Sequence, residues 1–313
     1  MSNNHIIDYS QINSDYSNMI HASNEEYCTV QEKSSKIKEI LLCKPDITHR
    51  HNELSIAYKN ISPGCIDCII QNGLTMVCNF NCNMDCFHCF NSLTSENHLV
   101  YHDYNEQVLL ASKHLNSFAI SGGEPLLFSD EIFYFFKKAR KIMGKNAELR
   151  LYTNGSLLNK NILEKFYNIG LNEIRISVKN FKINEEIFSL SKKYIPRVMV
   201  EIPVFPFKPE KYKKLLVKID NMKIFGINLL EAVYPFRKSS IYRQKGYKLY
   251  PKNILWEEFF SKTDSYIQSL LNSGLPIFKS EETCLELLLF SLEKKLKLNV
   301  HYCSFKNKNL KKK

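Results

Sequence analysis

The sequence has no long apolar run and no recognisable leader. Its longest apolar stretches, such as residues 285–289, fall far short of the roughly 20 residues that a membrane-spanning helix requires. Residues 1–20 lack the basic segment followed by an apolar segment that marks a secretory signal. We therefore expect a cytoplasmic protein without membrane contact.

Glycine and proline are scarce, with ten of each among 313 residues, while 44% of the residues are hydrophobic. This balance excludes a disordered chain and a fibrous one. The length suffices for one large core, or for one domain with a smaller appendage.

The positive charge is unevenly placed along the chain. The formal net charge is +11, but five lysines stand in the last eight residues. This placement predicts a solvated, frayed end rather than a grip on nucleic acid. Acidic peptides or RNA stay open as partners through the field of the whole molecule.

Cysteine is abundant for a chain in a reducing compartment. Six of the ten cysteines crowd into a short segment: Cys65, Cys68, Cys78, Cys82, Cys86 and Cys89. Disulfides are rare in such a compartment, so the crowding indicates metal ligation by thiolates. The remaining cysteines outside the proposed sites, Cys28, Cys43 and Cys284, are expected to be free thiols or core residues.

From Leu74 onward, short apolar or β-branched runs alternate with stretches of helical period, which is typical of repeated β/α units around a parallel sheet. The expected strands are residues 74–77, 117–120, 148–152, 173–178, 198–203 and 226–231. The expected helices between them are residues 105–114, 130–142, 159–168, 184–193 and 208–221. The fold class is therefore α/β, with a partial (β/α)6 barrel.

Three parts are expected along the chain. Residues 1–60 form a polar N-terminal cap with one helix at 34–42, and residues 61–235 form the barrel with a flanking cysteine pair. Residues 236–313 form a C-terminal α/β extension with helices near 256–271 and 281–296, a closing strand at 298–303 and the basic tail.

One cysteine motif follows the first expected strand: Cys82-x-x-x-Cys86-x-x-Cys89. Three thiolates in one loop can hold three irons of a cubane cluster and leave the fourth iron open to a chelating ligand. A shifted triad that uses Cys78 is the alternative within this segment. A zinc ribbon built on Cys65, Cys68 and two later cysteines also stays open.

Further motifs follow the next strands, where a β/α barrel places its active site. The segment Ser121-Gly122-Gly123-Glu124-Pro125 follows the second strand, and its glycines allow backbone amides to approach a ligand closely. Thr153-Asn154-Gly155 ends the third strand, Ser177 ends the fourth, and Glu201 lies in the fifth. Each alone is also explained by an ordinary turn or strand.

In this order, the motifs resemble the radical S-adenosylmethionine (radical SAM) superfamily over roughly residues 74–231. The resemblance implies a [4Fe-4S] cluster on Cys82, Cys86 and Cys89, with Gly122, Gly123 and Glu124 around the methionine amino group. It further implies that Asn154, Ser177 and Glu201 surround the methionine carboxylate or the ribose. It places His88 against the adenine.

The flanks are similar to a subgroup related to pyruvate formate-lyase-activating enzymes. The similarity lies in Ser62-Pro63-Gly64-Cys65-x-x-Cys68 and in Val300-His301-Tyr302-Cys303-Ser304. Two cysteines with this spacing can reach one metal, and His301 and Cys303 share one face of a strand. Cys65, Cys68 and Cys303 are therefore predicted to hold an auxiliary iron-sulfur cluster or zinc, with burial of Cys303 as the alternative.

The function predicted from these motifs is reductive cleavage of S-adenosylmethionine, giving a radical that removes hydrogen from an unidentified small molecule, peptide or RNA. An electron donor such as flavodoxin or ferredoxin is the expected partner. Three alternatives stay open: an activase for a glycyl-radical enzyme, an RNA- or peptide-modifying enzyme, and a zinc-binding module without catalysis.

Overall fold

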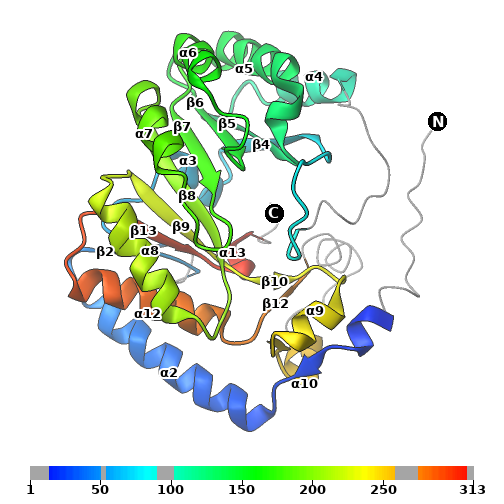
Figure 1. The fold of residues 1–313 in the computed structure, drawn as a ribbon, viewed down its shortest axis with the longest axis vertical. Coiled ribbons are helices and arrows are strands. Elements are labelled where there is room, and N and C mark those ends of the chain that lie inside the picture. The colour runs from blue at the N-terminus through cyan, green and yellow to red at the C-terminus, as the bar shows by residue number, and fades with distance from the viewer. Residues whose placement is uncertain (1–13, 51–53, 90–101, 258–273, 309–313) are drawn as a thin grey trace.

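The computed structural model describes residues 14–50, 54–89, 102–257 and 274–308 (Figure 1). Its centre is a mixed sheet in which nine strands pair in the order β2-β3-β13-β9-β8-β7-β6-β5-β4. No helix in these ranges is long and apolar enough to cross a membrane.

Six successive strands of this sheet run parallel and confirm the expected β/α repeat. They are β4 (Gly73–Asn79), β5 (Ser117–Gly122), β6 (Glu148–Thr153), β7 (Glu173–Ser177), β8 (Arg197–Val204) and β9 (Gly226–Glu231). Each expected strand lies within one or two residues of its observed bounds. The reason is that parallel strands buried under helices carry nearly continuous apolar runs.

The helices between these strands cover the outer face of the sheet, along the upper and left sides in Figure 1. They are α4 (His102–Ala111), α5 (Ser129–Met143), α6 (Lys160–Ile169), α7 (Glu185–Tyr194) and α8 (Pro209–Asn221), with a short 3-10 helix, η2 (Pro125–Phe128), before α5. The side chains of Asn159 and Asn184 cap α6 and α7 by accepting from backbone amides of the first turn. Outward side chains such as Leu151 and Ile176 form the main core with these helices.

The other edge of the sheet joins segments from both ends of the chain. Strand β13 (Asn299–Cys303) pairs in parallel with β9 and antiparallel with β3 (Ser55–Tyr58), which pairs with β2 (Ile47–Arg50). The sequence analysis missed β2 and β3, because strands this short carry little periodic signal. The three-part division of the chain stays a prediction, but the sheet crosses both of its boundaries.

The N-terminal helix is longer than expected. Helix α2 (Asn24–Leu42) begins at a capping box formed by Ser23 and Glu26 and packs beside α12 (Ser280–Glu293). Lys33 and Lys38 of α2 form ion pairs with Glu286 and Glu281 of α12.

A second, aromatic core lies below the strand ends. It is built by β1 (Ile20–His21), β10 (Val233–Tyr234), β11 (Lys248–Leu249), β12 (Leu275–Pro276), α9 (Ser239–Gln244), α10 (Lys252–Leu255) and α13 (Phe305–Lys308). The helix expected at 256–271 falls almost wholly outside the described residues.

The inner face of the sheet is polar, in contrast to its outer face. Strand register places Tyr152 beside Arg175, and it aligns Glu201, Asn228 and His301 across neighbouring strands. Helix α3 (Pro63–Ile69) contacts β4, β5 and β6, and its Cys65 meets Arg175 of this polar face. Charged groups at such a face must be paired because burial penalises a lone charge.

Candidate active site

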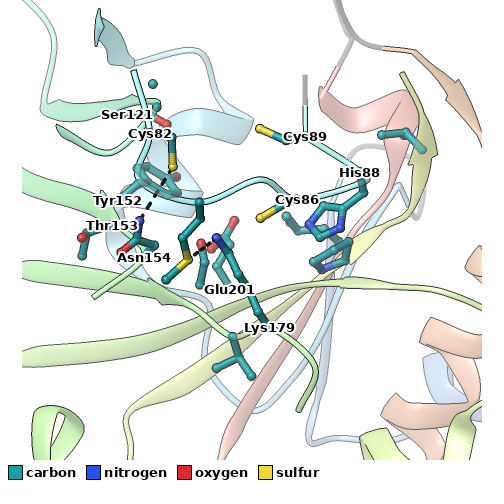
Figure 2. A pocket seen from close by; sticks show the side chains of 18 of the residues that line it. Cys82, Cys86, His88, Cys89, Ser121, Tyr152, Thr153, Asn154, Lys179 and Glu201 are labelled. Atoms are coloured by element: carbon teal, nitrogen blue, oxygen red, sulfur yellow. Dashed lines mark hydrogen bonds between the residues drawn. The ribbon is translucent and has the colours of Figure 1, made fainter. Parts of the chain in front are cut away.

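A cavity of about 390 Å³ opens at the carboxyl ends of the parallel strands. Its lining combines the three motif cysteines with residues from the ends of β5 to β9 (Figure 2). In a β/α architecture the carboxyl ends of the parallel strands lie together, and active sites form there. The arrangement agrees with the order of motifs along the chain.

The cysteine loop follows β4 and presents its three thiols to this cavity. In Figure 2 the sulfur atoms of Cys82, Cys86 and Cys89 face the same space. Cys82 is exposed, and the other two are half-buried. The Asn154 amide nitrogen lies 3.8 Å from the Cys82 sulfur and donates to Asn83 Oδ1 at 2.8 Å.

Gly122 and Gly123 hold this loop against the end of β5. The Gly123 amide donates to the Asn79 carbonyl at 2.9 Å, and the Glu124 amide donates to the Asn81 carbonyl at 2.7 Å. A Cβ atom on Gly123 would stand 1.9 Å from the Asn81 oxygen, so no larger residue fits there. The close approach observed at these glycines is toward the cysteine loop, and their predicted approach to a ligand stays a prediction.

Glu124 is fully buried and is not among the residues that line the cavity. Its carboxylate accepts from Leu126 N at 3.1 Å, from Thr153 Oγ1 at 2.6 Å and from Asn154 N at 2.6 Å. Burial raises the pKa of this carboxyl, and the three hydrogen bonds oppose the rise. A direct contact of Glu124 with the methionine amino group stays a prediction; in the structure the side chain joins the ends of β5 and β6.

The other predicted cofactor residues line the cavity. Ser177 is exposed to it, and Glu201 accepts from Asn228 Nδ2 at 3.0 Å and from Arg175 Nη1 at 3.3 Å. The ring of His88 packs beside Phe87 and Phe205, with centroids 5.1 and 5.8 Å away. Burial lowers the pKa of His88 to about 4.

Tyr152, Lys179 and Met84 also line the cavity and were missed by the sequence analysis. The Lys179 ammonium lies 2.6 Å from the Met84 sulfur. The only sequence signal for these residues was their position, because Tyr152 and Lys179 lie at or just after the carboxyl ends of β6 and β7. Neither residue type is diagnostic there without the fold.

The second cysteine group lies in a different environment. Cys65 is buried in α3, and its sulfur accepts from Arg175 Nη2 at 2.8 Å. Burial alone would raise the pKa of Cys65, but the positive fields of Arg175, His301 and Arg150 outweigh it and lower the pKa to about 6.

The other members of that group differ in their surroundings, and His301 contacts Cys65. Cys68 is exposed on the same helix. Cys303 is half-buried at the end of β13 and accepts from Asn307 Nδ2 at 3.4 Å. His301 is hydrogen-bonded to Ser55 at 2.7 Å.

Across the described ranges, no group of three or more His, Cys, Asp or Glu side chains is placed to hold a single metal ion. A cubane differs from one ion because each thiolate binds a separate iron, so its ligands stand further apart. Three thiols of one loop that share a cavity fit such a cluster. The Cys65 sulfur, in contrast, is paired with the Arg175 guanidinium in this structure, and the auxiliary centre stays a prediction.

The remaining cysteines agree with the sequence analysis. Cys284 packs in the main core, and Cys28 and Cys43 are exposed. Cys78 is buried, which raises its pKa to about 12, and it does not line the cavity. The triad that would use Cys78 is therefore disfavoured.

Comparison with known proteins identifies a radical SAM segment in this chain. Residues 76–184 match the family model described as the Radical SAM superfamily. Over 193 residues, 56% of this chain, the chain is 28% identical to the "Putative glycyl-radical enzyme activating enzyme" of Methanocaldococcus jannaschii. It is 32% identical over 119 residues, 36% of this chain, to the "Probable GTP 3',8-cyclase" of the same organism.

These matches span 51% and 37% of the two relatives, so the chain spans about half or less of the curated relatives' length. Among solved structures, SuiB of Streptococcus suis aligns with 74% of this chain and 49% of its own, at 15% identity and a TM-score of 0.49. The similarity to the radical SAM superfamily thus lies in residues 76–184 of this chain.

Proposed function

We propose that this protein is an enzyme that holds a [4Fe-4S] cluster on Cys82, Cys86 and Cys89 and reductively cleaves S-adenosylmethionine bound in the same cavity. The resulting 5'-deoxyadenosyl radical would remove a hydrogen atom from a substrate. The supporting observation is that the three thiols share one cavity with the ends of five parallel strands.

When bound, the cluster would supply the electron for the cleavage and an open iron for the methionine amine and carboxylate. The chain's own groups would then bind the rest of the molecule. The Ser177 hydroxyl and the Glu201 carboxylate, which line the cavity, would bond ribose hydroxyls. Glu201 is itself oriented by Arg175 and Asn228. The ring of His88, which lines the same cavity, would offer an apolar wall for adenine.

The aromatic core beneath the cavity would also keep water from a reactive radical. Lys179 lines the cavity beside His88.

The test is anaerobic purification, reconstitution with iron and sulfide, and analysis for 5'-deoxyadenosine after addition of dithionite and S-adenosylmethionine. We expect a brown chromophore and formation of 5'-deoxyadenosine. Stoichiometric zinc, no chromophore and no cleavage would contradict the proposal. Replacement of dithionite by reduced flavodoxin or ferredoxin then tests the proposed electron donor.

A second candidate function is the activation of a glycyl-radical enzyme. It is favoured by the relative from Methanocaldococcus jannaschii whose name states that activity. Mixing the reduced protein and S-adenosylmethionine with a glycyl-radical enzyme encoded beside its gene should then produce a glycyl-radical signal in electron paramagnetic resonance. A genome without such an enzyme would count against this candidate.

A further inference from the structure

A second cavity, of about 190 Å³, adjoins the first one. The two share the lining residues Cys86, His88, Val178, Lys179 and Pro203. If S-adenosylmethionine fills the first cavity, the second is a neighbouring space for another molecule. This step rests on the proposed function.

Aromatic rings form the walls of the second cavity. The rings of Phe205 and Tyr247 are stacked with centroids 4.8 Å apart, and Phe87 stands 5.2 Å from Phe205. Phe181 and Tyr212 add a further pair, 4.7 Å apart. Ring faces of this kind favour a flat, unsaturated ligand.

Lysines give the cavity a positive charge. Lys179, Lys208 and Lys245 all line it, and the described part of the chain gives none of them a carboxylate partner within salt-bridge distance. The Lys245 ammonium lies 5.4 Å from the centroid of the Phe87 ring. Asp85 also lines the cavity, but its carboxylate is paired with Lys238 at 2.7 Å. The balance of charge favours an anion.

We propose that this cavity binds the substrate, and that the substrate is a small molecule with a flat unsaturated group and a carboxylate or phosphate. The ring walls select the flat group, and the lysines select the acid. A carboxylate and a phosphate present the same acceptor chemistry to an ammonium group. Tyr247 and Lys245 come from the segment after β9, beyond the last of the six parallel strands, so the C-terminal part contributes to a site that is otherwise built by the barrel.

The probe for this site is 8-anilinonaphthalene-1-sulfonate, a flat anion whose fluorescence rises in an apolar environment. It is titrated into the anaerobically reconstituted protein, with and without saturating S-adenosylmethionine. We expect binding that S-adenosylmethionine does not displace. The double variant Lys208→Ala/Lys245→Ala should raise the Kd about fivefold, because two exposed charge contacts are lost.

The matched control is Lys214→Ala, which removes an exposed lysine of α8 that does not line the cavity. It should bind the probe as the wild type does. An uncharged analogue, N-phenyl-1-naphthylamine, should bind the wild type more weakly than the sulfonate.

Three results would overturn the inference: an unchanged Kd in the double variant, displacement of the probe by S-adenosylmethionine, or equal affinity for the uncharged analogue. Cleavage of S-adenosylmethionine by the wild type is measured separately. If no 5'-deoxyadenosine forms, the proposed function fails, while the titration still decides whether the second cavity binds flat anions.

Discussion

Two groups of cysteines lie on the same side of the sheet in opposite environments. Cys82, Cys86 and Cys89 belong to a loop and share one open cavity. Cys65 is buried and contacts a guanidinium, while Cys68 is exposed on the same helix and Cys303 is half-buried at the end of β13. The difference teaches that cysteines close together in a sequence can fold into unlike surroundings, because the groups beside each thiol set its pKa and its exposure.

The largest expected effect is the loss of iron and of activity when the three cysteines of the loop are removed. Replacing Cys82, Cys86 and Cys89 together by Ala should abolish 5'-deoxyadenosine formation and remove the bound iron, since no thiolate is left to hold the cluster. Cleavage at the wild-type rate in this variant would refute the assignment.

Replacing Cys65, Cys68 and Cys303 together by Ala tests the predicted auxiliary centre. A fall to about half of the wild-type iron would establish that centre, and unchanged iron would reject it.

A substitution that leaves every cysteine in place should also remove iron. In Gly123→Ala the new methyl group would collide with the Asn81 backbone and displace the cysteine loop. We expect iron per chain after reconstitution to fall severalfold. The control Gly144→Ala adds a methyl group in open space at a positive φ, so it introduces strain without a collision. Equal iron in both variants would show that the loop does not depend on this contact.

Glu124 should strengthen S-adenosylmethionine binding at the cysteine-loop site without contributing to iron binding. In Glu124→Gln an amide NH2 would face the Asn154 or Thr153 donors and disturb Asn154, which contacts Cys82. The expected loss is about 1.5–3 kcal/mol in S-adenosylmethionine binding, with iron content unchanged. Binding is measured calorimetrically, with the exposed Glu186→Gln as the control. Loss of iron would assign Glu124 to the cluster site itself.

Cys65 should contribute to stability rather than to cleavage. Truncation by Cys65→Ala removes one buried acceptor from Arg175, which keeps Glu173 and Glu201 as partners. The free energy of unfolding of the metal-free protein should fall by about 1–3 kcal/mol in chemical denaturation. Cys28→Ala, at an exposed position of α2, should stay within about 0.5 kcal/mol of the wild type.

The smallest expected effect, taken per pH unit, is a dependence of stability on pH. The pKa of Cys65 is lowered to about 6 in the folded protein, below the roughly 8.5 of an unfolded thiol. Its contribution is therefore fully present above pH ~8.5 and is lost as the pH falls toward 6, by at most about 1.4 kcal/mol per pH unit. The measurement is the stability difference between the wild type and Cys65→Ser at several pH values; a difference that does not change with pH would mean that the thiol stays protonated.

Much of the fold follows from local sequence. The strands β4 to β9 could be placed because each is an apolar run bounded by turn residues, and the helices because their apolar residues recur with helical period. The loop with Cys82, Cys86 and Cys89 could be recognised for a similar reason, since all of its ligands lie within one short segment. The motifs after successive strands follow from the rule that carboxyl ends of parallel strands meet.

Long-range pairing decided the rest, because no local pattern encodes it. Strand β3 exists as a strand through its pairing with β13, which lies more than 240 residues further along the chain, and β2 in turn pairs with β3. The sequence predicts Glu124 as a ligand-binding residue, but in the structure Thr153 and Asn154 at the end of β6 donate hydrogen bonds to its buried carboxylate. The sequence by itself thus determined the β/α repeat and the cysteine loop, since both depend on neighbouring residues. The surroundings of Cys65, and the lysine-rimmed aromatic cavity beside the cysteine loop, were decided by the tertiary structure, because only folding brings distant charges and rings together.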